Sequence, residues 1–167
     1  MPEPVILCID DQREVLAALL KDLEPFAELF DLVDAESAED AGAVLDDMID
    51  RGVPVALIVS DHVMPGVTGV QFLTSVRERG DLPHTRKLLL TGLATHEDTI
   101  RAINEAAVDQ YIAKPWQPEP LLDVVGRLVT HFVLETYPDG YQKFLPVLNQ
   151  DVMVERMQQG SGPHGDR

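Results

Sequence analysis

The feature that most constrains the fold is a short apolar run that recurs along the chain and ends each time in polar residues. Residues 5–9 and 55–59 are continuously apolar and rich in β-branched side chains. They are too short for helices, as expected of strands that are covered on both faces. The first run ends at Asp10 and Asp11, and Asp61 follows the second.

Further segments repeat this alternation. Weaker apolar runs complete a set of five predicted strands: residues 30–33, 87–91 and 110–113. Apolar residues recur at helical spacing between and after the strands: residues 14–23, 37–49, 68–76, 95–103 and 121–133. Ser37, Thr68 and Thr95 stand where helix N-caps are expected, and Gln71 follows Thr68 at the spacing of a capping box.

Five alternations of strand and helix predict an α/β fold, a doubly wound, five-stranded parallel sheet with helices on both faces. Ligands of such sheets bind beyond the carboxyl ends of the strands. Polar residues stand at these ends: Asp10, Asp11, Asp61, Thr91 and Lys114. We expect these side chains to converge at one edge of the sheet.

Several carboxylates at one edge repel one another, and a divalent cation would remove that conflict. Magnesium prefers oxygen ligands and keeps several waters, so Asp11, Asp61 and a backbone carbonyl from the loop after Asp61 are candidate ligands. Lys114 supplies a positive charge and Thr91 a hydroxyl, the groups needed to hold phosphoryl oxygens. A carboxylate that attacks phosphorus forms an acyl phosphate.

The chain resembles the receiver domain of two-component response regulators over about residues 4–134, and therefore a flavodoxin-like receiver fold. The resemblance rests on four motifs taken together: Asp10-Asp11, Asp61-His62-Val63-Met64-Pro65-Gly66-Val67-Thr68-Gly69, Leu90-Thr91-Gly92 and Tyr111-Ile112-Ala113-Lys114-Pro115. It implies that Asp61 accepts a phosphoryl group from a sensor histidine kinase or a histidine phosphotransfer protein. It also implies a Mg²⁺ site made by Asp10, Asp11, Asp61 and the backbone carbonyl of Val63.

The same resemblance assigns roles to residues of the last two strands. Thr91 and Lys114 would contact the phosphoryl oxygens. Thr91 and Tyr111 would act as switch residues, with Tyr111 changing its rotamer on activation. Pro115 would follow a cis peptide bond. Protein–protein interactions with a downstream output would be switched in this way, and no enzymatic turnover is expected beyond self-phosphorylation from a phosphodonor and slow self-dephosphorylation.

Two alternative functions stay open at this point. A phosphohydrolase of the haloacid dehalogenase type also uses a nucleophilic Asp, but it needs a second acid two residues later, where this chain has Val63 after Asp61 and Gln12 after Asp10. Alternatively, the chain is the receiver half of a longer signalling enzyme, a cyclic-nucleotide cyclase or a cyclic dinucleotide phosphodiesterase, as Trp116 after Lys114-Pro115 suggests. No glycine-rich phosphate loop follows any predicted strand.

Composition bears on partners and location. Acidic residues number 29 against 13 Lys and Arg, which gives a formal charge of −16. Such a surface repels phosphate backbones and anionic lipid, so we expect neither nucleic acid nor a membrane as a direct partner. The single cysteine, Cys8, cannot form an intrachain disulfide, and the first residues lack a signal-peptide pattern. These observations favour a cytoplasmic location.

The chain continues past the predicted receiver. We expect a receiver domain over residues 1–136 and a helical extension with a flexible tail over residues 137–167. A helix is predicted to begin near Pro138, with Pro146 causing a break at residues 144–146 or dividing the extension into two short helices. The extension needs a surface for its apolar residues: the last receiver helix, a second subunit or an absent output domain. We favour self-association as a homodimer.

Overall fold

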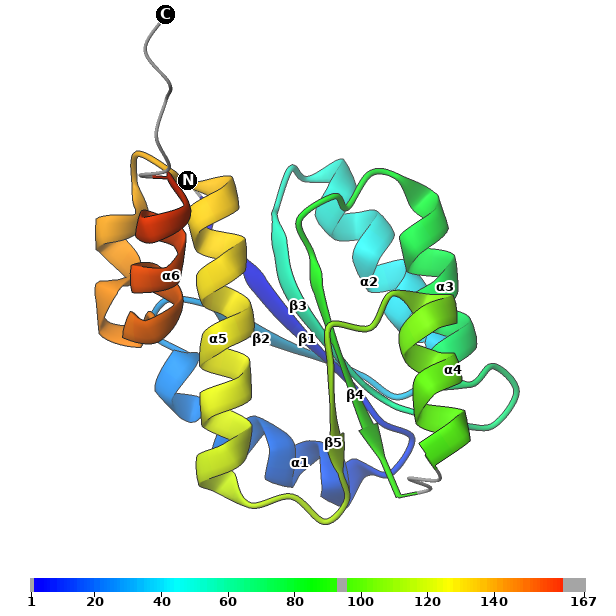
Figure 1. Cartoon of the computed structure of the whole chain (residues 1–167). Coiled ribbons are helices and arrows are strands. Elements are labelled where there is room, and N and C mark those ends of the chain that lie inside the picture. The colour runs from blue at the N-terminus through cyan, green and yellow to red at the C-terminus, as the bar shows by residue number, and fades with distance from the viewer. Residues whose placement is uncertain (1, 93–95, 161–167) are drawn as a thin grey trace, which may run out of the picture.

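The computed structural model describes residues 2–92 and 96–160 and contains a five-stranded parallel sheet (Figure 1). Its strands are β1 (Val5–Ile9), β2 (Asp31–Ala35), β3 (Val55–Asp61), β4 (Arg86–Thr91) and β5 (Gln110–Ala113). Their order across the sheet is β2-β1-β3-β4-β5, and each neighbouring pair is parallel. The predicted cap Thr95 and the tail from residue 161 lie outside the described residues.

Helices cover both faces of the sheet, which confirms the doubly wound α/β fold. The helices between and after the strands are α1 (Arg13–Asp22), η1 (Glu24–Phe26), α2 (Ala38–Asp50), α3 (Gly69–Arg79), α4 (His96–Ala106) and α5 (Pro118–Thr136). One apolar cluster joins the sheet to α1 and α5, and the other joins it to α2, α3 and α4 (Figure 1). No helix in the described part of the chain is long and apolar enough to cross a membrane.

Local sequence signals explain where these elements begin. Every residue of β1 and β3 is buried, as their apolar runs predict for all but the last two residues of β3, Ser60 and Asp61. The Ser37 side chain accepts a hydrogen bond from the backbone N–H of Asp40 and caps α2. Thr68 and Gln71 form a complete capping box at the start of α3. The predicted caps at Ser37 and Thr68 are therefore confirmed.

The register of the strands brings their polar ends together. Ile9 of β1 pairs with Ser60 of β3, so Asp10 and Asp61, the next residues, are level with each other. Thr91 of β4 pairs with Ala113 of β5, which places Lys114 one residue beyond that pair. The sheet thus collects side chains from four strands at one edge, because all parallel strands end there.

The extension differs from the predicted helix at its start. Regular structure begins at Tyr141 rather than near Pro138, with a 3₁₀ helix, η2 (Tyr141–Val147), followed by α6 (Gln150–Gly160). Pro146 lies inside η2. A proline disfavours a continuous α-helix because it lacks an N–H and clashes with the preceding turn, so a short 3₁₀ segment serves instead. Of the two predicted arrangements, the pair of short helices is confirmed.

The extension packs on its own chain. Phe144 is 3% exposed, and its ring lies 5.3 Å from that of Tyr137 and 5.5 Å from that of Phe30 between ring centroids. The Thr130 hydroxyl of α5, which is buried, accepts a hydrogen bond from the backbone N–H of Asn149 at 2.8 Å. Figure 1 shows α6 beside α5. The last receiver helix therefore supplies the surface that the extension needs.

Part of the extension stays exposed. Leu145, Val154 and Met157 are each at least 50% exposed, whereas Leu148 and Val152 are buried with Phe144. Phe144, Leu148 and Val152 therefore pack within the chain, and these three residues do not need a second subunit. A homodimer through the final receiver helix and the extension stays a prediction.

Replacing Phe144 tests whether this docking contributes to stability. Phe144→Ala should lower the free energy of unfolding by about 3–5 kcal/mol, because it removes a buried aromatic side chain and leaves a cavity. Leu145→Ala, at the exposed neighbouring position, should change that free energy by less than about 0.5 kcal/mol. Urea unfolding of both variants measures the difference. Equal small effects would mean that the extension does not dock in solution.

Candidate functional site

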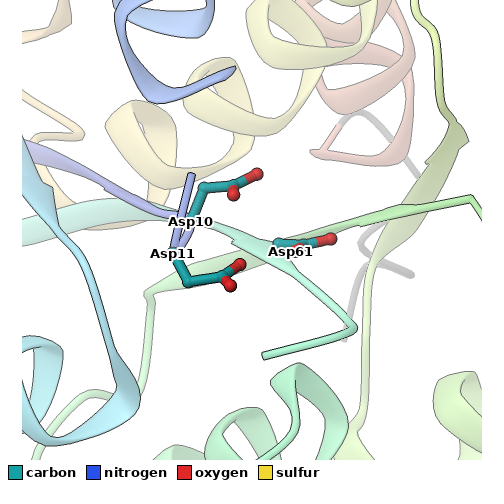
Figure 2. Close-up of side chains that lie close together, drawn as sticks. All are labelled: Asp10, Asp11 and Asp61. Atoms are coloured by element: carbon teal, nitrogen blue, oxygen red, sulfur yellow. The ribbon is translucent and has the colours of Figure 1, made fainter. Parts of the chain in front are cut away.

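Three carboxylates meet at the carboxyl ends of β1 and β3. Asp10 and Asp11 follow β1, Asp61 is the last residue of β3, and carboxylate oxygens of the three lie within 4.8 Å of one another (Figure 2). Asp10 is 1% exposed and Asp61 is 6% exposed, whereas Asp11 is open to solvent. The site therefore has two sheltered carboxylates and one that faces water.

Lys114 joins the two sheltered carboxylates. Its Nζ lies 2.9 Å from Asp10 Oδ2 and 2.9 Å from Asp61 Oδ1. When ionised, the three acids carry three negative charges and Lys114 carries one positive charge, so the cluster has an excess of two negative charges. One divalent cation would balance that excess.

Burial and charge change the proton affinities at this site. Burial raises the pKa of Asp61 above its ordinary value, and repulsion from Asp10 adds to this effect, while the hydrogen bond from Lys114 opposes it. Burial disfavours the charged form of Lys114, but hydrogen bonds to Asp61 and Asp10 outweigh burial and raise the pKa of Lys114. Lys114 is therefore a cation at neutral pH.

The loop after Asp61 is held close to the strand end by a glycine. Gly69 opens α3, and its N–H donates to the carbonyl of His62 at 2.8 Å. A Cβ on Gly69 would overlap the carbonyl oxygen of Asp61 and would come within 2.9 Å of the carbonyl carbon of Asp61. Only a residue without a side chain fits here, because the obstacle is backbone that cannot rotate away.

The remaining candidate residues lie on β4, on β5 and on the loop after β3. Thr91 is buried at the end of β4, and its carbonyl accepts a hydrogen bond from the Lys114 N–H at 2.9 Å. Val63 is 56% exposed on the loop after β3, and Tyr111 is 41% exposed on β5. The peptide bond between Lys114 and Pro115 is cis, as the resemblance implies. The structure thus gathers Asp10, Asp11, Asp61 and Lys114, with Thr91 at the adjoining strand end.

The donor set fits Mg²⁺. All three candidate side-chain ligands are carboxylates, and Mg²⁺ prefers oxygen ligands and usually keeps several waters. The exposed position of Asp11 leaves room for such waters. The excess negative charge of the cluster also favours a divalent cation.

Comparison with known proteins agrees with the fold. The sequence model of the response regulator receiver domain matches residues 6–126. The chain belongs to the response regulator receiver family. Relatives of this receiver include the hydrogenase transcriptional regulatory protein HoxA of Cupriavidus necator, 38% identical over 127 residues. The match covers 76% of this chain and only 24% of HoxA.

Two shorter receivers match nearly from end to end. The chemotaxis protein CheY-3 of Vibrio cholerae is 29% identical over 126 residues, which cover 74% of this chain and 89% of CheY-3. The crystal structure of the signal receiver domain of an HD domain-containing protein from Pseudomonas fluorescens Pf-5 superposes with a TM-score of 0.69. That structure is 28% identical and covers 81% of this receiver and 93% of its own chain. The family match and the likeness to response regulators do not favour either alternative function.

Sequence reasoning missed one polar residue of this site. Ser60 precedes Asp61 in β3, and its buried hydroxyl donates to the Asp61 carbonyl at 2.9 Å. The signal was available, since Ser60 is the one hydroxyl residue between the apolar run at residues 55–59 and Asp61. Gly69 belongs to one of the four motifs, and its close approach to Asp61 is a tertiary feature that the motif does not predict.

Proposed function

We propose that this receiver accepts a phosphoryl group on Asp61 from a phosphohistidine and so switches protein–protein interactions. The observation that carries the proposal is the placement of Asp61, sheltered at a strand end beside Asp10, Asp11 and Lys114. The phosphorylated unit of this proposal spans residues 1–136, and the extension docks on it. The chain acts in signalling rather than in metabolic turnover.

The chain's own residues have separate tasks in this reaction. An oxygen of the ionised Asp61 carboxylate attacks phosphorus, which forms an acyl phosphate and releases the donor imidazole. Lys114 and Thr91 hold the phosphoryl oxygens, the former by charge and the latter by its hydroxyl. Mg²⁺ would be held by Asp10, Asp11, Asp61 and the carbonyl of Val63. When bound, Mg²⁺ would neutralise charge on the carboxylates and on the phosphoryl oxygens.

Switching is proposed to pass from this site to β5. Thr91 is the last residue of β4 and pairs with Ala113, which precedes Lys114. Tyr111 lies on the neighbouring strand β5 and is exposed. Engagement of the Thr91 hydroxyl by the phosphoryl group would change the surroundings of Tyr111, whose rotamer then alters the surface that a downstream protein reads.

A surface for the phosphodonor protein lies next to Lys114. A groove of about 600 Å³ lies between α1 and the segment after β5, with Val15, Ala18 and Trp116 among its lining residues. A sensor histidine kinase or a histidine phosphotransfer protein is the proposed partner, and a second copy of the chain is a further candidate. A cytoplasmic location belongs to the same proposal. Burial raises the pKa of the Cys8 thiol to about 12, so this thiol stays protonated and unreactive.

Phosphorylation by a small phosphodonor tests the proposal without knowledge of the kinase. The full chain should gain one phosphoryl group in the presence of Mg²⁺, and a chelator should prevent the gain. Intact-protein mass spectrometry measures the number of groups added. A chain that gains no phosphoryl group, or that gains it equally with a chelator, would overturn the proposal.

Thermal unfolding tests the metal site separately. Mg²⁺ that binds only the folded chain should stabilise it by about 2.7 kcal/mol at a hundredfold excess over its dissociation constant. Because the raised pKa of Asp61 favours its protonated form in the folded state, the stabilisation by Mg²⁺ should be smaller in mildly acidic buffer than at neutral pH. Asp11→Ala, at the exposed ligand, should lose most of the shift.

A matched variant controls for general charge effects. Asp34→Ala removes an exposed acid from the edge strand β2 and should keep the full Mg²⁺ shift. An unchanged melting temperature of the wild-type chain with Mg²⁺ would contradict the site.

A further inference from the structure

Hydrogen bonds hold the peptide group between Asp61 and His62 and the carbonyl of His62. The Ser60 hydroxyl donates to the Asp61 carbonyl at 2.9 Å, and the His62 N–H donates to the carbonyl of Leu90 in β4 at 3.0 Å. The Gly69 N–H donates to the His62 carbonyl at 2.8 Å, and the Gly69 backbone packs against the Asp61 carbonyl. These contacts fix the plane of the Asp61–His62 peptide and the orientation of the His62 carbonyl.

Ser60 is an unusual residue for its position. It has no exposed surface, and the five residues before it in β3 are all apolar and buried. A buried hydroxyl needs a hydrogen-bond partner, because an unpaired one is costly. Ser60 finds that partner in the carbonyl of the next residue, Asp61. An alanine would fill nearly the same space without needing one.

We propose that Ser60 is a positioning residue for the phosphoryl site and acts through the backbone of Asp61. This inference rests on the function proposed above. The Ser60 hydrogen bond fixes the orientation of the Asp61–His62 peptide, from which the chain continues to the Val63 carbonyl. It thereby holds the Asp61 carboxylate and the Val63 carbonyl in the relative placement that Mg²⁺ binding needs. A preorganised site does not have to order this loop when the metal binds.

The strand offers a matched control at its other end. The Thr85 hydroxyl, also buried, donates to the carbonyl of Val55, the first residue of β3, at 2.7 Å. Thr85→Val therefore deletes the same kind of bond from the same strand, far from the carboxylates. A purely structural role for Ser60 predicts the same consequences for both deletions.

Mg²⁺ affinity distinguishes the two roles. Ser60→Ala should raise the dissociation constant for Mg²⁺, measured by calorimetry on the full chain, by about three- to tenfold, the worth of one hydrogen bond. Thr85→Val should leave that constant unchanged, while both variants lower the melting temperature. Ser60→Cys keeps a weak donor of similar size and should give an intermediate Mg²⁺ affinity.

Each outcome decides a different question. Unchanged Mg²⁺ affinity in Ser60→Ala, or an equal loss in Thr85→Val, would overturn the role of Ser60 while the wild-type chain still binds Mg²⁺ and gains its phosphoryl group. A wild-type chain that binds no Mg²⁺ and gains no phosphoryl group would instead overturn the proposed function.

Discussion

Asp61→Asn should abolish phosphorylation of the receiver. The amide has the shape of the carboxylate but no anionic oxygen to attack phosphorus, so no acyl phosphate can form. The side chain can still accept a hydrogen bond from Lys114, so we expect the fold to survive. Intact-protein mass spectrometry after incubation with Mg²⁺ and a small phosphodonor should show one added phosphoryl group on the wild-type chain and none on the variant.

The chemistry of the bond provides a second test of this assignment. An acyl phosphate is cleaved by hydroxylamine, so the group on the wild-type chain should disappear after that treatment. Asp34→Asn, at an exposed position on β2, should be labelled like the wild type. Equal labelling of Asp61→Asn, or a label that survives hydroxylamine, would mean that another residue is the acceptor.

Gly69→Ala should disrupt the site with almost as large an effect, although Gly69 contributes no functional group. The added Cβ would overlap the Asp61 carbonyl oxygen, so either the start of α3 or the end of β3 must shift. Overpacking of this kind costs about 1–3 kcal/mol of stability. We expect Mg²⁺ affinity and the rate of phosphorylation each to fall by about tenfold or more, since a displacement of about 1 Å at a reacting centre has large kinetic effects.

Gly42 provides the control for this substitution. It lies within α2, and a Cβ there would meet no atom within 4 Å. Gly42→Ala should therefore stabilise the chain by about 0.5–1 kcal/mol and should leave Mg²⁺ binding unchanged. Calorimetry, thermal unfolding and phosphorylation of both variants would measure the contrast. Normal Mg²⁺ binding and normal phosphorylation in Gly69→Ala would show that the close approach is not needed.

The sequence by itself determined the strands and the site they build. Two uninterrupted apolar runs could only be strands buried on both faces, and the helical spacing between runs required parallel pairing. Because parallel strands end at the same edge, Asp10, Asp61, Thr91 and Lys114 had to meet there. The helix starts at Ser37 and Thr68 were equally local, since a cap bonds an N–H only two or three residues away.

Only the tertiary structure decided what depends on surfaces far apart in the sequence. The apolar pattern of the extension showed that Phe144 needed a partner, but Tyr137 and Phe30 were selected by the shape of the folded receiver. Likewise, no local sequence pattern predicts that Lys114 bridges both Asp10 and Asp61 or that Gly69 contacts the Asp61 carbonyl. Periodicity reports which side of an element is apolar, whereas such contacts depend on how packed elements approach one another, to within less than the width of a methyl group.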